Sequence, residues 1–411
     1  MKQLLENTKT NKLVSLVICL LVLTTLLSTL ALYSPISSTI IRIVQIYPTN
    51  PRIHPLKDDY AKCDLFKGQW VEDSKGPLYT NTTCSTIPTS KDCFLHGRND
   101  KEFLYWRWKP HRCQLARFEP MTFFQIMRNK RLAFIGDSVA RNQVESLLCL
   151  LSQEEAPIDV YKDAKDRSRT WFFPKSNFTL MVLWTRFLVK GVEKEVGVFD
   201  LELDQVDEKW SYDVNQGLVD YAIVSSAQWY FKKKYLYEGG KLVGCLYCNE
   251  TNLTEFKVSF AIGKAFQTTL RYINGCKKCK GMVTLVRTIS PSHFENGTWR
   301  NGGHCDRSKP YSKVEVENML ATNKNNVEWE VRNIQMDEIE RVKKQGSIKG
   351  QQKFEAMDIT KVMLMRPDGH PGSHWRDKKK KGFNDCVHWC MPGPIDVWND
   401  LLLALLRKPV L

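Results

Sequence analysis

The stretch Arg131-Leu-Ala-Phe-Ile-Gly-Asp-Ser-Val-Ala-Arg-Asn-Gln-Val-Glu-Ser-Leu-Leu-Cys149 decides the fold, because its hydrophobic period changes within a few residues. Leu132 to Ile135 is a short apolar run typical of a buried parallel strand, and Gly136 permits the tight turn that must follow. Behind Ser138 the apolar residues recur at helical spacing, and Asp137 and Ser138 are good N-cap residues. The stretch therefore predicts a strand, a sharp turn and a helix.

A serine at this position lies beside unpaired backbone N–H groups in the partial positive field of a helix N-terminus. These groups can stabilise a serine alkoxide and the oxyanion formed when the serine attacks an acyl carbonyl. Such chemistry also needs a base. On this stretch alone, simple capping of a helix by Asp137 and Ser138 is the commoner explanation.

A second stretch, Asp385-Cys-Val-His-Trp-Cys390, contains a histidine and a carboxylate that could supply the base. Asp385 and His388 are three residues apart, and on one helical turn they would share a face. A carboxylate that orients an imidazole, while the other ring nitrogen accepts a hydroxyl proton, is the serine–histidine–acid arrangement. Because short motifs match by chance, such a pair taken alone is more often a surface ion pair.

The N-terminal region of the 411-residue chain has the organisation of a membrane anchor. Residues 1–12 are polar and contain lysines, and residues 13–33 form an uncharged apolar run long enough to span a bilayer. The run exceeds the core of a cleavable signal peptide and no clear cleavage site follows it, so we favour a signal anchor over a cleaved signal. The lysines place residues 1–12 in the cytosol and residues 63–411 in a lumen, joined by a proline-containing stem at 34–62.

The lumenal part is long enough for one α/β domain with insertions. Residues 63–130 are rich in cysteine and tryptophan without a persistent helix pattern, which predicts a disulfide-tied irregular lobe whose aromatic rings mostly fill a small core. Residues 131–411 alternate apolar runs with helical stretches, as in a doubly wound, mostly parallel sheet with its active site at the carboxyl ends of the strands. The expected strands are Leu180–Val189, Val196–Leu201, Val219–Val224 and Met282–Ile289, and the expected helices lie at Phe260–Ile273 and within Gln335–Lys344.

Twelve of the thirteen cysteines follow the apolar run, together with five N-x-[ST] sequons, which indicates an oxidising secretory lumen. The two C-x-x-C segments have a spacing that suggests zinc in cytosolic proteins, but in this topology we expect two disulfides. The sequons are at Asn81, Asn177, Asn249, Asn252 and Asn296. The cysteines expected in disulfides are Cys63, Cys84, Cys93, Cys113, Cys149, Cys245, Cys248, Cys276, Cys279, Cys305, Cys386 and Cys390.

The net charge of +15 would favour nucleic acid in a nuclear protein, but the signal anchor argues against that partner. The basic excess fits better a solvated face or attraction to anionic glycans, lipids or an anionic donor. We expect no metal, because no compact ligand set stands out beyond the scattered His293, His304, His370 and His374.

Taken together, the motifs resemble the plant trichome-birefringence-like family of polysaccharide O-acetyltransferases. The match runs from Cys63 to Trp398 in the expected order. Its segments are Cys63-Asp64, Trp106-Arg107-Trp108-x-Pro110, Gly136-Asp137-Ser138-x-x-Arg141-Asn142, Arg287-Thr288, Asn296-Gly297-x-Trp299, Gly302-Gly303-x-Cys305-Asp306, Asp368-Gly369-His370-Pro371 and Asp385–Asn399. The resemblance implies an SGNH-hydrolase-like α/β/α fold, a type II Golgi membrane topology and acetyl transfer to hydroxyls of wall polysaccharides.

Within that family, Glu145-Ser146-Leu147-Leu148-Cys149 and the paired C-x-x-C segments are most similar to the xyloglucan-acetylating branch. This similarity implies side-chain galactose of xyloglucan as the acceptor, ahead of xylan, mannan and pectin. It also implies no tightly bound cofactor. The acetyl donor would be a co-substrate, either acetyl-CoA or an acetyl group from another carrier or from an acetyl-delivering membrane protein.

One segment departs from the family, since many relatives carry Asn-Thr-Gly-His-Trp-Trp where this chain has Ser225-Ser226-Ala227-Gln228-Trp229-Tyr230. Because the asparagine oxyanion donor is absent, we expect the oxyanion hole to use the Ser138 amide on the Gly136-Asp137 turn. Arg141 or Asn142 is expected nearby. The candidates for acceptor binding are Gln228, Trp229, Arg287 and His370, although packing at a strand end explains Gln228 and Trp229 equally well. His370 is also the reserve base, with a loop-structuring role as its alternative.

The expected mechanism is double displacement, with Ser138 as nucleophile, His388 as base and Asp385 orienting the imidazole. Cys386 and Cys390 flank His388, so we expect both to be bridged, one to the N-terminal lobe at a residue such as Cys93 and the other to Cys305. Two alternatives remain. A glycan acetylesterase would use the same triad with different water access, and a non-catalytic glycan-binding protein would retain the triad as a remnant.

Overall fold

The computed structural model describes residues 21–25, 63–279, 281–299, 301–322, 326–346, 352–375 and 383–408. The chain divides into two compact units, Met1–Lys57 and Asp58–Leu411. In the first unit only the helical residues 21–25 are described, so the rest of the predicted tail, anchor and stem lies outside the described residues. No helix in the described part of the chain is both long and apolar enough to cross a membrane.

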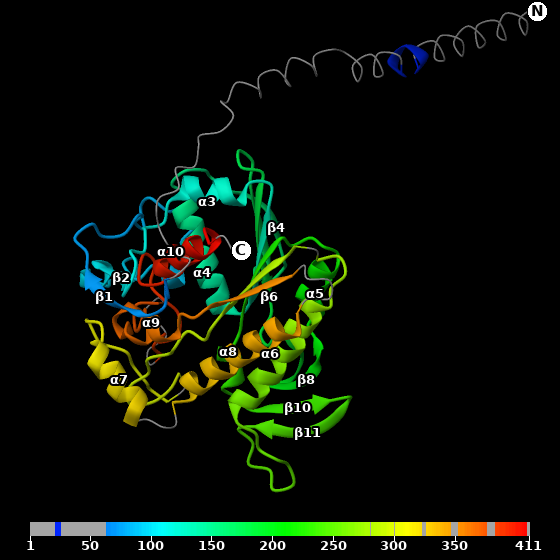
Figure 1. Ribbon diagram of the computed structural model, residues 1–411, viewed down its shortest axis with the longest axis vertical. Coiled ribbons are helices and arrows are strands. Elements are labelled where there is room, and N and C mark those ends of the chain that lie inside the picture. Colours follow the sequence, from blue (N-terminus) through cyan, green and yellow to red (C-terminus); the bar gives the residue numbers. More distant parts are fainter. Residues whose placement is uncertain are drawn as a thin grey trace, which may run out of the picture. The chain divides into compact units, whose positions relative to one another are not determined.

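The second unit is built on a seven-stranded sheet (Figure 1). In order across the sheet, its strands are β13 (Lys353–Met357), β12 (Val283–Arg287), β9 (Tyr221–Ser225), β3 (Arg131–Gly136), β6 (Phe178–Trp184), β5 (Arg169–Phe173) and β4 (Ile158–Lys162). The strands from β13 to β6 run parallel, and β5 and β4 continue the sheet in antiparallel fashion. The carboxyl ends of the five parallel strands therefore meet at one edge, as a doubly wound sheet requires.

Alternate residues of β3 enter two different cores, which makes the sheet the middle of three layers. Leu132 and Phe134 pack in one core with α4 (Ser138–Leu151) and α10 (Asp396–Leu406). Ala133 and Ile135 pack in the other core, whose helices are α5 (Glu208–Asn215), α6 (Val258–Asn274) and α8 (Val327–Gln345). The expected α/β/α architecture with a mostly parallel sheet is confirmed.

Smaller elements surround these layers. A second sheet has the order β11 (Lys241–Leu246), β10 (Lys234–Glu238), β8 (Val198–Val206) and β7 (Val189–Glu195). The remaining α-helices are α3 (Pro120–Met127), α7 (Lys313–Thr322) and α9 (Thr360–Leu364). Short 3-10 turns are η2 (Thr89–Lys91), η3 (Glu102–Leu104), η4 (Gln228–Tyr230) and η5 (Pro367–Gly369).

The apolar run Leu180–Val189 is not one strand, so that prediction is wrong. Strand β6 ends at Trp184, and β7 begins at Val189. The break has a backbone cause, because Leu188 has a φ of 64°, which lies outside the extended region that a strand requires. The other expected strands and both expected helices overlap β8, β9, β12, α6 and α8.

The N-terminal lobe contains a hairpin of β1 (Gly68–Glu72) and β2 (Trp106–Pro110) in addition to irregular loops. Trp70 and Trp108 are buried and pack edge to face at 5.9 Å, and Tyr79 is buried with its hydroxyl donating to Asp396 at 2.7 Å. These rings fill a core that is continuous with α4 and α10. They are not exposed as sugar-stacking surfaces, in agreement with the expected core-filling role.

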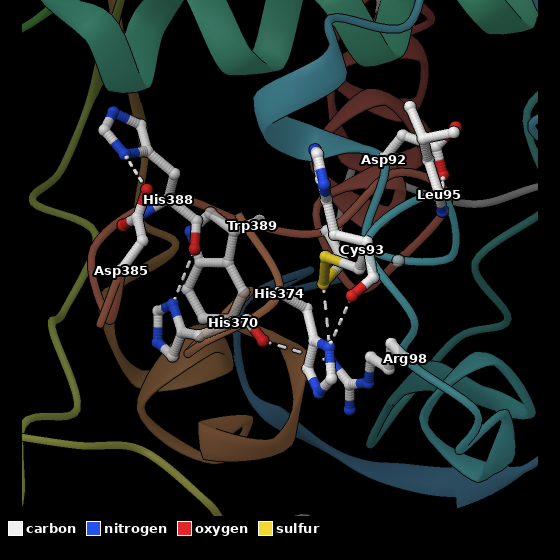
Figure 2. Close-up of a disulfide and its surroundings, with 12 residues drawn as sticks. Asp92, Cys93, Leu95, Arg98, His370, His374, Asp385, His388 and Trp389 are labelled. Atoms are coloured by element: carbon white, nitrogen blue, oxygen red, sulfur yellow. Dashed lines mark hydrogen bonds and ion pairs between the residues drawn. A yellow bond between two sulfur atoms is a disulfide. The ribbon is translucent and has the colours of Figure 1, made fainter. Parts of the chain in front are cut away.

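The described residues contain six disulfides, and three of them hold the α/β core to distant segments. Figure 2 shows the surroundings of the one at Cys93. The pairs are Cys63–Cys113, Cys84–Cys149, Cys93–Cys390, Cys245–Cys248, Cys276–Cys279 and Cys305–Cys386. The two C-x-x-C segments are thus internal disulfides. The partners of Cys386 and Cys390 are those expected for residues that flank His388.

We predict that a Cys93→Ala, Cys390→Ala double variant loses about 2–5 kcal/mol of unfolding free energy, because the bridge closes a loop of 297 residues. Non-reducing peptide mapping checks the pairing, and denaturant unfolding checks the stability. A Cys245→Ala, Cys248→Ala variant, whose loop spans three residues, is the matched control and should lose less. Free thiols at both Cys386 and Cys390 in the native chain would contradict this assembly.

Candidate active site

Ser138 lies at the carboxyl end of β3, the middle strand of the sheet, and is the first residue of α4. The turn before it needs glycine, because a Cβ at Gly136 would lie 2.0 Å from the Ser225 carbonyl oxygen. Asp137 caps the helix by accepting the Val139 N–H at 3.0 Å. The predicted strand, turn and helix are therefore present, and Ser138 lies in the positive field of the helix N-terminus.

Asp385 and His388 lie on a loop, not on a helical turn, so that expectation is wrong. One oxygen of the Asp385 carboxylate accepts the backbone N–H groups of Val387 at 3.1 Å and His388 at 2.9 Å. The backbone of Asp385 is bonded on its other side to Gly372. The three-residue spacing thus forms a turn that the Asp385 carboxylate caps with one oxygen. The second oxygen of that carboxylate is left to contact the imidazole.

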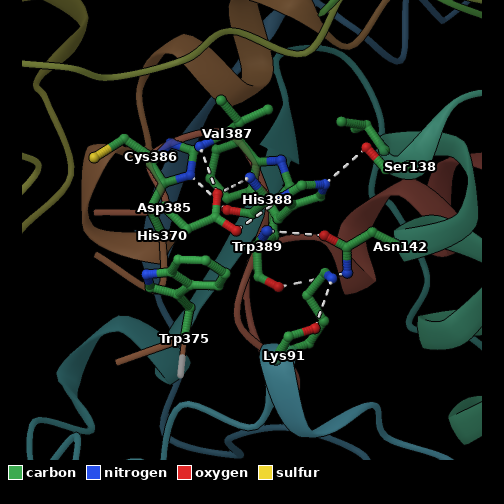
Figure 3. Close-up of polar contacts among 12 residues, drawn as sticks. Lys91, Ser138, Asn142, His370, Trp375, Asp385, Cys386, Val387, His388 and Trp389 are labelled. Atoms are coloured by element: carbon green, nitrogen blue, oxygen red, sulfur yellow. Dashed lines mark hydrogen bonds and ion pairs between the residues drawn. The ribbon is translucent and has the colours of Figure 1, made fainter. Parts of the chain in front are cut away.

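Ser138, His388 and Asp385 form one hydrogen-bonded chain (Figure 3). His388 Nδ1 lies 2.8 Å from Asp385 Oδ2, and His388 Nε2 lies 2.9 Å from Ser138 Oγ. Burial acts to raise the pKa of Asp385, but the facing imidazole and the hydrogen bonds outweigh it and hold that pKa well below its ordinary value. The chain therefore has the geometry for a general base to accept the serine proton.

The same helix that carries Ser138 also holds the loop that carries His388. Asn142 on α4 accepts the backbone N–H of Trp389 at 2.8 Å, and the Trp389 indole N–H donates to Ser290 Oγ at 2.9 Å. Both side chains are fully buried. The helix that carries Ser138 thus also anchors the backbone next to His388.

A family model described as the GDSL/SGNH-like acyl-esterase family found in Pmr5 and Cas1p matches residues 115–405. The chain belongs to this acyl-esterase family. A model of the PMR5 N-terminal domain matches residues 61–114, which correspond to most of the lobe. The expected SGNH-like fold is therefore confirmed.

Curated plant proteins match over most of the chain. Xyloglucan O-acetyltransferase 4 of Populus trichocarpa is 52% identical over 90% of this chain and 90% of its own. Xyloglucan O-acetyltransferase 2 of Arabidopsis thaliana is 48% identical over 87% of this chain and 84% of its own. Protein trichome birefringence-like 20 of Arabidopsis thaliana is 41% identical over 84% and 72%. The predicted membership of the trichome-birefringence-like O-acetyltransferases is confirmed, and with it an acyl-transferring enzyme.

The two side chains that were expected to assist the oxyanion hole of this acyl-esterase fold have other contacts. Arg141 binds Glu145 at 2.9 Å and Asp166 at 3.3 Å, and the Asn142 amide is used by Trp389. The structure therefore does not support either as an oxyanion donor. The Ser138 N–H has no hydrogen-bond partner among the described residues, so it and the field of α4 remain the candidates.

Arg287 and His370 support the site from within. Each is 3% exposed, so the structure does not support the expected contacts with an acceptor sugar. Arg287 donates to Ser225 Oγ at 2.8 Å, and its positive charge opposes the rise in the pKa of Asp137 that burial causes. Ser225 is the first residue of the segment that was expected to depart from the family, and its hydroxyl accepts this hydrogen bond.

The other two acceptor candidates lie nearer the surface. Gln228 donates its amide to the Ser290 carbonyl at 2.7 Å, so it braces the loop beside the site. Trp229 is partly exposed, and its ring lies 6.3 Å from that of Trp184. Of the four candidates, only Trp229 has an aromatic face at the edge of the sheet where Ser138 lies.

Sequence reasoning missed a buried histidine pair behind the loop of His388, formed by His293 and His370, the second of which is labelled in Figures 2 and 3. His370 stacks on Trp389 at 4.1 Å, and its Nδ1 lies 2.7 Å from the His388 carbonyl. Its Nε2 lies 2.7 Å from His293 Nδ1, and His293 Nε2 lies 3.1 Å from the Leu364 carbonyl. No sequence signal joins residues 77 positions apart.

A proton count constrains this pair. Three hydrogen bonds in a row between two carbonyls need three protons, whereas two neutral imidazoles carry two. Burial lowers the pKa of His293 to about 4 and holds that of His370 well below its ordinary value, so both rings are neutral near pH 7. We infer that the longest contact, at the Leu364 carbonyl, is the one without a proton. The His370 Nδ1–H then donates to the His388 carbonyl. His370 is enclosed and both of its ring nitrogens have partners, so the geometry gives no support to its expected role as a reserve base.

Two expected features concern the surface and metals. The asparagines of the five sequons are all exposed, as glycan acceptors must be, and their glycosylation remains a prediction. Among the described residues, no group of three or more His, Cys, Asp or Glu side chains could hold a metal ion.

We predict that Asp385→Asn abolishes most activity without unfolding the loop. The amide oxygen still accepts the two backbone N–H groups, but the amide N–H forces the wrong tautomer on His388, at a cost of about 10³–10⁴ in kcat. Steady-state rates and urea unfolding of Asp385→Asn and Asp385→Ala separate the two roles, since only the alanine variant also loses the turn. Near-native rates in the asparagine variant would contradict the assignment.

The lowered pKa of Asp385 also has a consequence for stability. A carboxyl whose pKa is lower in the folded than in the unfolded chain stabilises the fold above pH ~4, and this contribution is lost as the pH falls further. The free energy of unfolding of the native chain, measured against Asp385→Asn, should therefore fall on acidification below pH ~4. A constant difference across that range would contradict it.

We predict that His370→Phe keeps the stacking on Trp389 but lowers kcat about 10-fold, because a buried hydrogen bond to the His388 carbonyl is lost. His374→Phe is the matched control, since its ring nitrogen contacts a carbonyl of the lobe, that of His96, at 3.1 Å. Steady-state rates of the two variants make the comparison. Equal effects of both variants would show that the contact of His370 has no special role.

Proposed function

We propose that this chain transfers acetyl groups to hydroxyls of xyloglucan through an acetyl ester on Ser138. The observation that carries the mechanism is the chain of contacts from Asp385 through His388 to Ser138. The acceptor is supported by relatives named xyloglucan O-acetyltransferases that are 48–52% identical over most of their length. Side-chain galactose remains the first expectation for the acetylated sugar.

In the first half-reaction, Ser138 Oγ attacks the acetyl carbonyl while His388 Nε2 accepts the hydroxyl proton. The tetrahedral oxyanion is stabilised by the Ser138 N–H and the N-terminus of α4. The bond between the acetyl carbon and the carrier then breaks, and His388 returns its proton to the departing carrier. Asp385 stays ionised throughout and holds the imidazolium in place.

In the second half-reaction, a sugar hydroxyl replaces the carrier. His388 deprotonates that hydroxyl, its oxygen attacks the acetyl ester, and Ser138 leaves with the proton that His388 carries. The acetyl group ends on the polysaccharide and the enzyme is unchanged. Water that entered in place of the sugar would give hydrolysis by the same steps, so the fit of the acceptor decides the reaction.

The donor and the cellular setting belong to the same proposal. The acetyl group comes from a diffusible or membrane-delivered carrier such as acetyl-CoA, with no tightly bound cofactor. The chain acts in the Golgi lumen, attached by one N-terminal helix as a type II membrane protein. The apolar run at 13–33, the six disulfides and the exposed sequons support this location.

A glycan acetylesterase is the second candidate, because the matching family model is described as an acyl-esterase family. Xylan, mannan and pectin remain the alternative acceptors. A non-catalytic glycan-binding protein is disfavoured by the aligned contacts of three groups that binding alone would not require.

We predict that the purified full chain in detergent, given acetyl-CoA and xyloglucan oligosaccharides, adds acetyl groups to galactose. Mass spectrometry of the products measures this transfer. A parallel incubation with acetylated oligosaccharides alone should release acetate much more slowly. Ser138→Ala should lose at least about 10³ of the transfer rate because it lacks the nucleophile.

The inactive variant must remain folded for this comparison, which circular dichroism and thermal unfolding can establish. Faster hydrolysis than transfer would favour the esterase. Transfer by Ser138→Ala at the native rate would contradict the double-displacement mechanism.

A further inference from the structure

Two tryptophans lie on either side of β3 at the edge where Ser138 lies. Trp184 ends β6 and is the sheet partner of Gly136, and Trp229 follows β9, whose last residue is the other partner of Gly136. Their ring centroids are 6.3 Å apart and the rings are nearly perpendicular, at 83°. The pair therefore spans the end of the strand that leads to Ser138.

Three cations gather on these rings, and we call the five residues Arg167, Trp184, Arg186, Trp229 and Lys232 the cationic platform. The Arg167 guanidinium lies 4.5 Å from the Trp184 ring, and that of Arg186 lies 5.3 Å and 4.8 Å from the rings of Trp184 and Trp229. Lys232 Nζ lies 5.3 Å from the Trp229 ring. The aromatic faces hold the cations in place but do not neutralise them.

Among the described residues, Glu193 is the one carboxylate that forms an ion pair with the two arginines of the cationic platform, while Asp207 and Asp163 act on Arg186 and Arg167 from farther away. Arg186 has its nearest carboxylate, that of the half-exposed Glu193, at 3.7 Å, and its buried Nε has no hydrogen-bond partner among the described residues. Arg167 makes no ion pair with any residue that the structure describes. Burial lowers the pKa of Arg186, and the neighbouring charge of Arg167 lowers it further. An anion bound between the two guanidinium groups would relieve this repulsion.

The cationic platform is tied to the site by its backbone. The Arg186 carbonyl accepts the Ser226 hydroxyl at 2.6 Å, and the next residue, Ala227, donates its N–H to Asp137 at 3.5 Å. Asp137 immediately precedes the nucleophile. Two hydrogen bonds and the peptide bond between Ser226 and Ala227 thus join Arg186 to the residue that precedes Ser138.

We propose that the cationic platform binds the acetyl donor, as a carrier with phosphate groups and a flat ring. Phosphates would contact Arg167, Arg186 and Lys232, and the ring would stack on the partly exposed Trp229. Charge separates this ligand from the other substrate, because a neutral polysaccharide presents no anion for three cations to bind. The inference rests on the proposed function and specifies its acetyl donor. It also changes the predicted role of Trp229 from acceptor binding to donor binding.

The test removes charge from the cationic platform with Arg167→Gln and Lys232→Gln, singly and together, in the full chain. Arg128→Gln and Lys190→Gln are the matched controls, since both side chains lie elsewhere, near Lys175 and Gln205. Initial rates are measured against acetyl-CoA at fixed xyloglucan oligosaccharide, and then against the oligosaccharide at fixed acetyl-CoA. We expect the double variant to raise the KM for acetyl-CoA about 10-fold or more, with the KM for the oligosaccharide and kcat within about two-fold.

A binding measurement makes the test independent of turnover. Calorimetry with free coenzyme A and the Ser138→Ala chain should show binding that the two platform substitutions weaken about 10-fold and that the control substitutions leave unchanged. Unchanged coenzyme A binding, or a rise in the KM of the oligosaccharide instead, would overturn the inference. If the native chain transferred no acetyl group at all, the proposed function would fail, while calorimetry would still decide the ligand of the cationic platform.

Discussion

The hydrogen bond between His388 Nε2 and Ser138 Oγ joins residues 250 positions apart, and the rest of the fold keeps these two atoms 2.9 Å apart. The proposed nucleophile, Ser138, is placed by local structure alone, at the end of the middle strand and the start of a helix. The proposed base lies on a loop without a helix or strand, and its local support is the turn that Asp385 caps. Long-range contacts must therefore hold the loop.

Those contacts come from several directions. Asn142 binds the backbone beside His388 from the helix of the nucleophile, and disulfides at Cys386 and Cys390 fix the loop on both sides. The lobe adds Arg98, which donates to the carbonyls of Asp368 and His370. The lobe is thus part of the active-site scaffold and not a separate module. Residues 61–114 match a domain model of their own, yet their disulfide to Cys390 places them in the support of the base.

Burial has opposite consequences for the charged groups of this site. Asp385 stays ionised because two N–H groups and an imidazole compensate its loss of water, which suits a carboxylate that must stabilise an imidazolium. His293 and His370 have only carbonyls and each other, so burial keeps them neutral. The nearby imidazoles therefore add no positive charge that would oppose protonation of His388 during the reaction.

The sequence predicted those parts of the site that depend on neighbours in the chain. The change of period at Gly136 located the strand, turn and helix, and the short Asp–His motif identified the two residues that lie in line with Ser138. Prediction from the sequence failed where the role of a side chain depends on a partner that is distant in the chain. Arg141 and Asn142 follow Ser138 by three and four residues, and only the fold shows that Asn142 binds Trp389 while Arg141 faces Glu145 and Asp166. Likewise, nothing near Arg287, His293 or His370 in the chain reveals that they are buried behind the loop.

The central claim is that Ser138 carries the acetyl group between donor and acceptor. The most direct measurement is rapid-quench peptide mass spectrometry of the full chain mixed with acetyl-CoA in the absence of polysaccharide. The account predicts one acetyl adduct, on the peptide that contains Ser138, which disappears when xyloglucan oligosaccharides are added. Transfer that proceeds with no adduct at Ser138, or with the acetyl group on another residue, would contradict it.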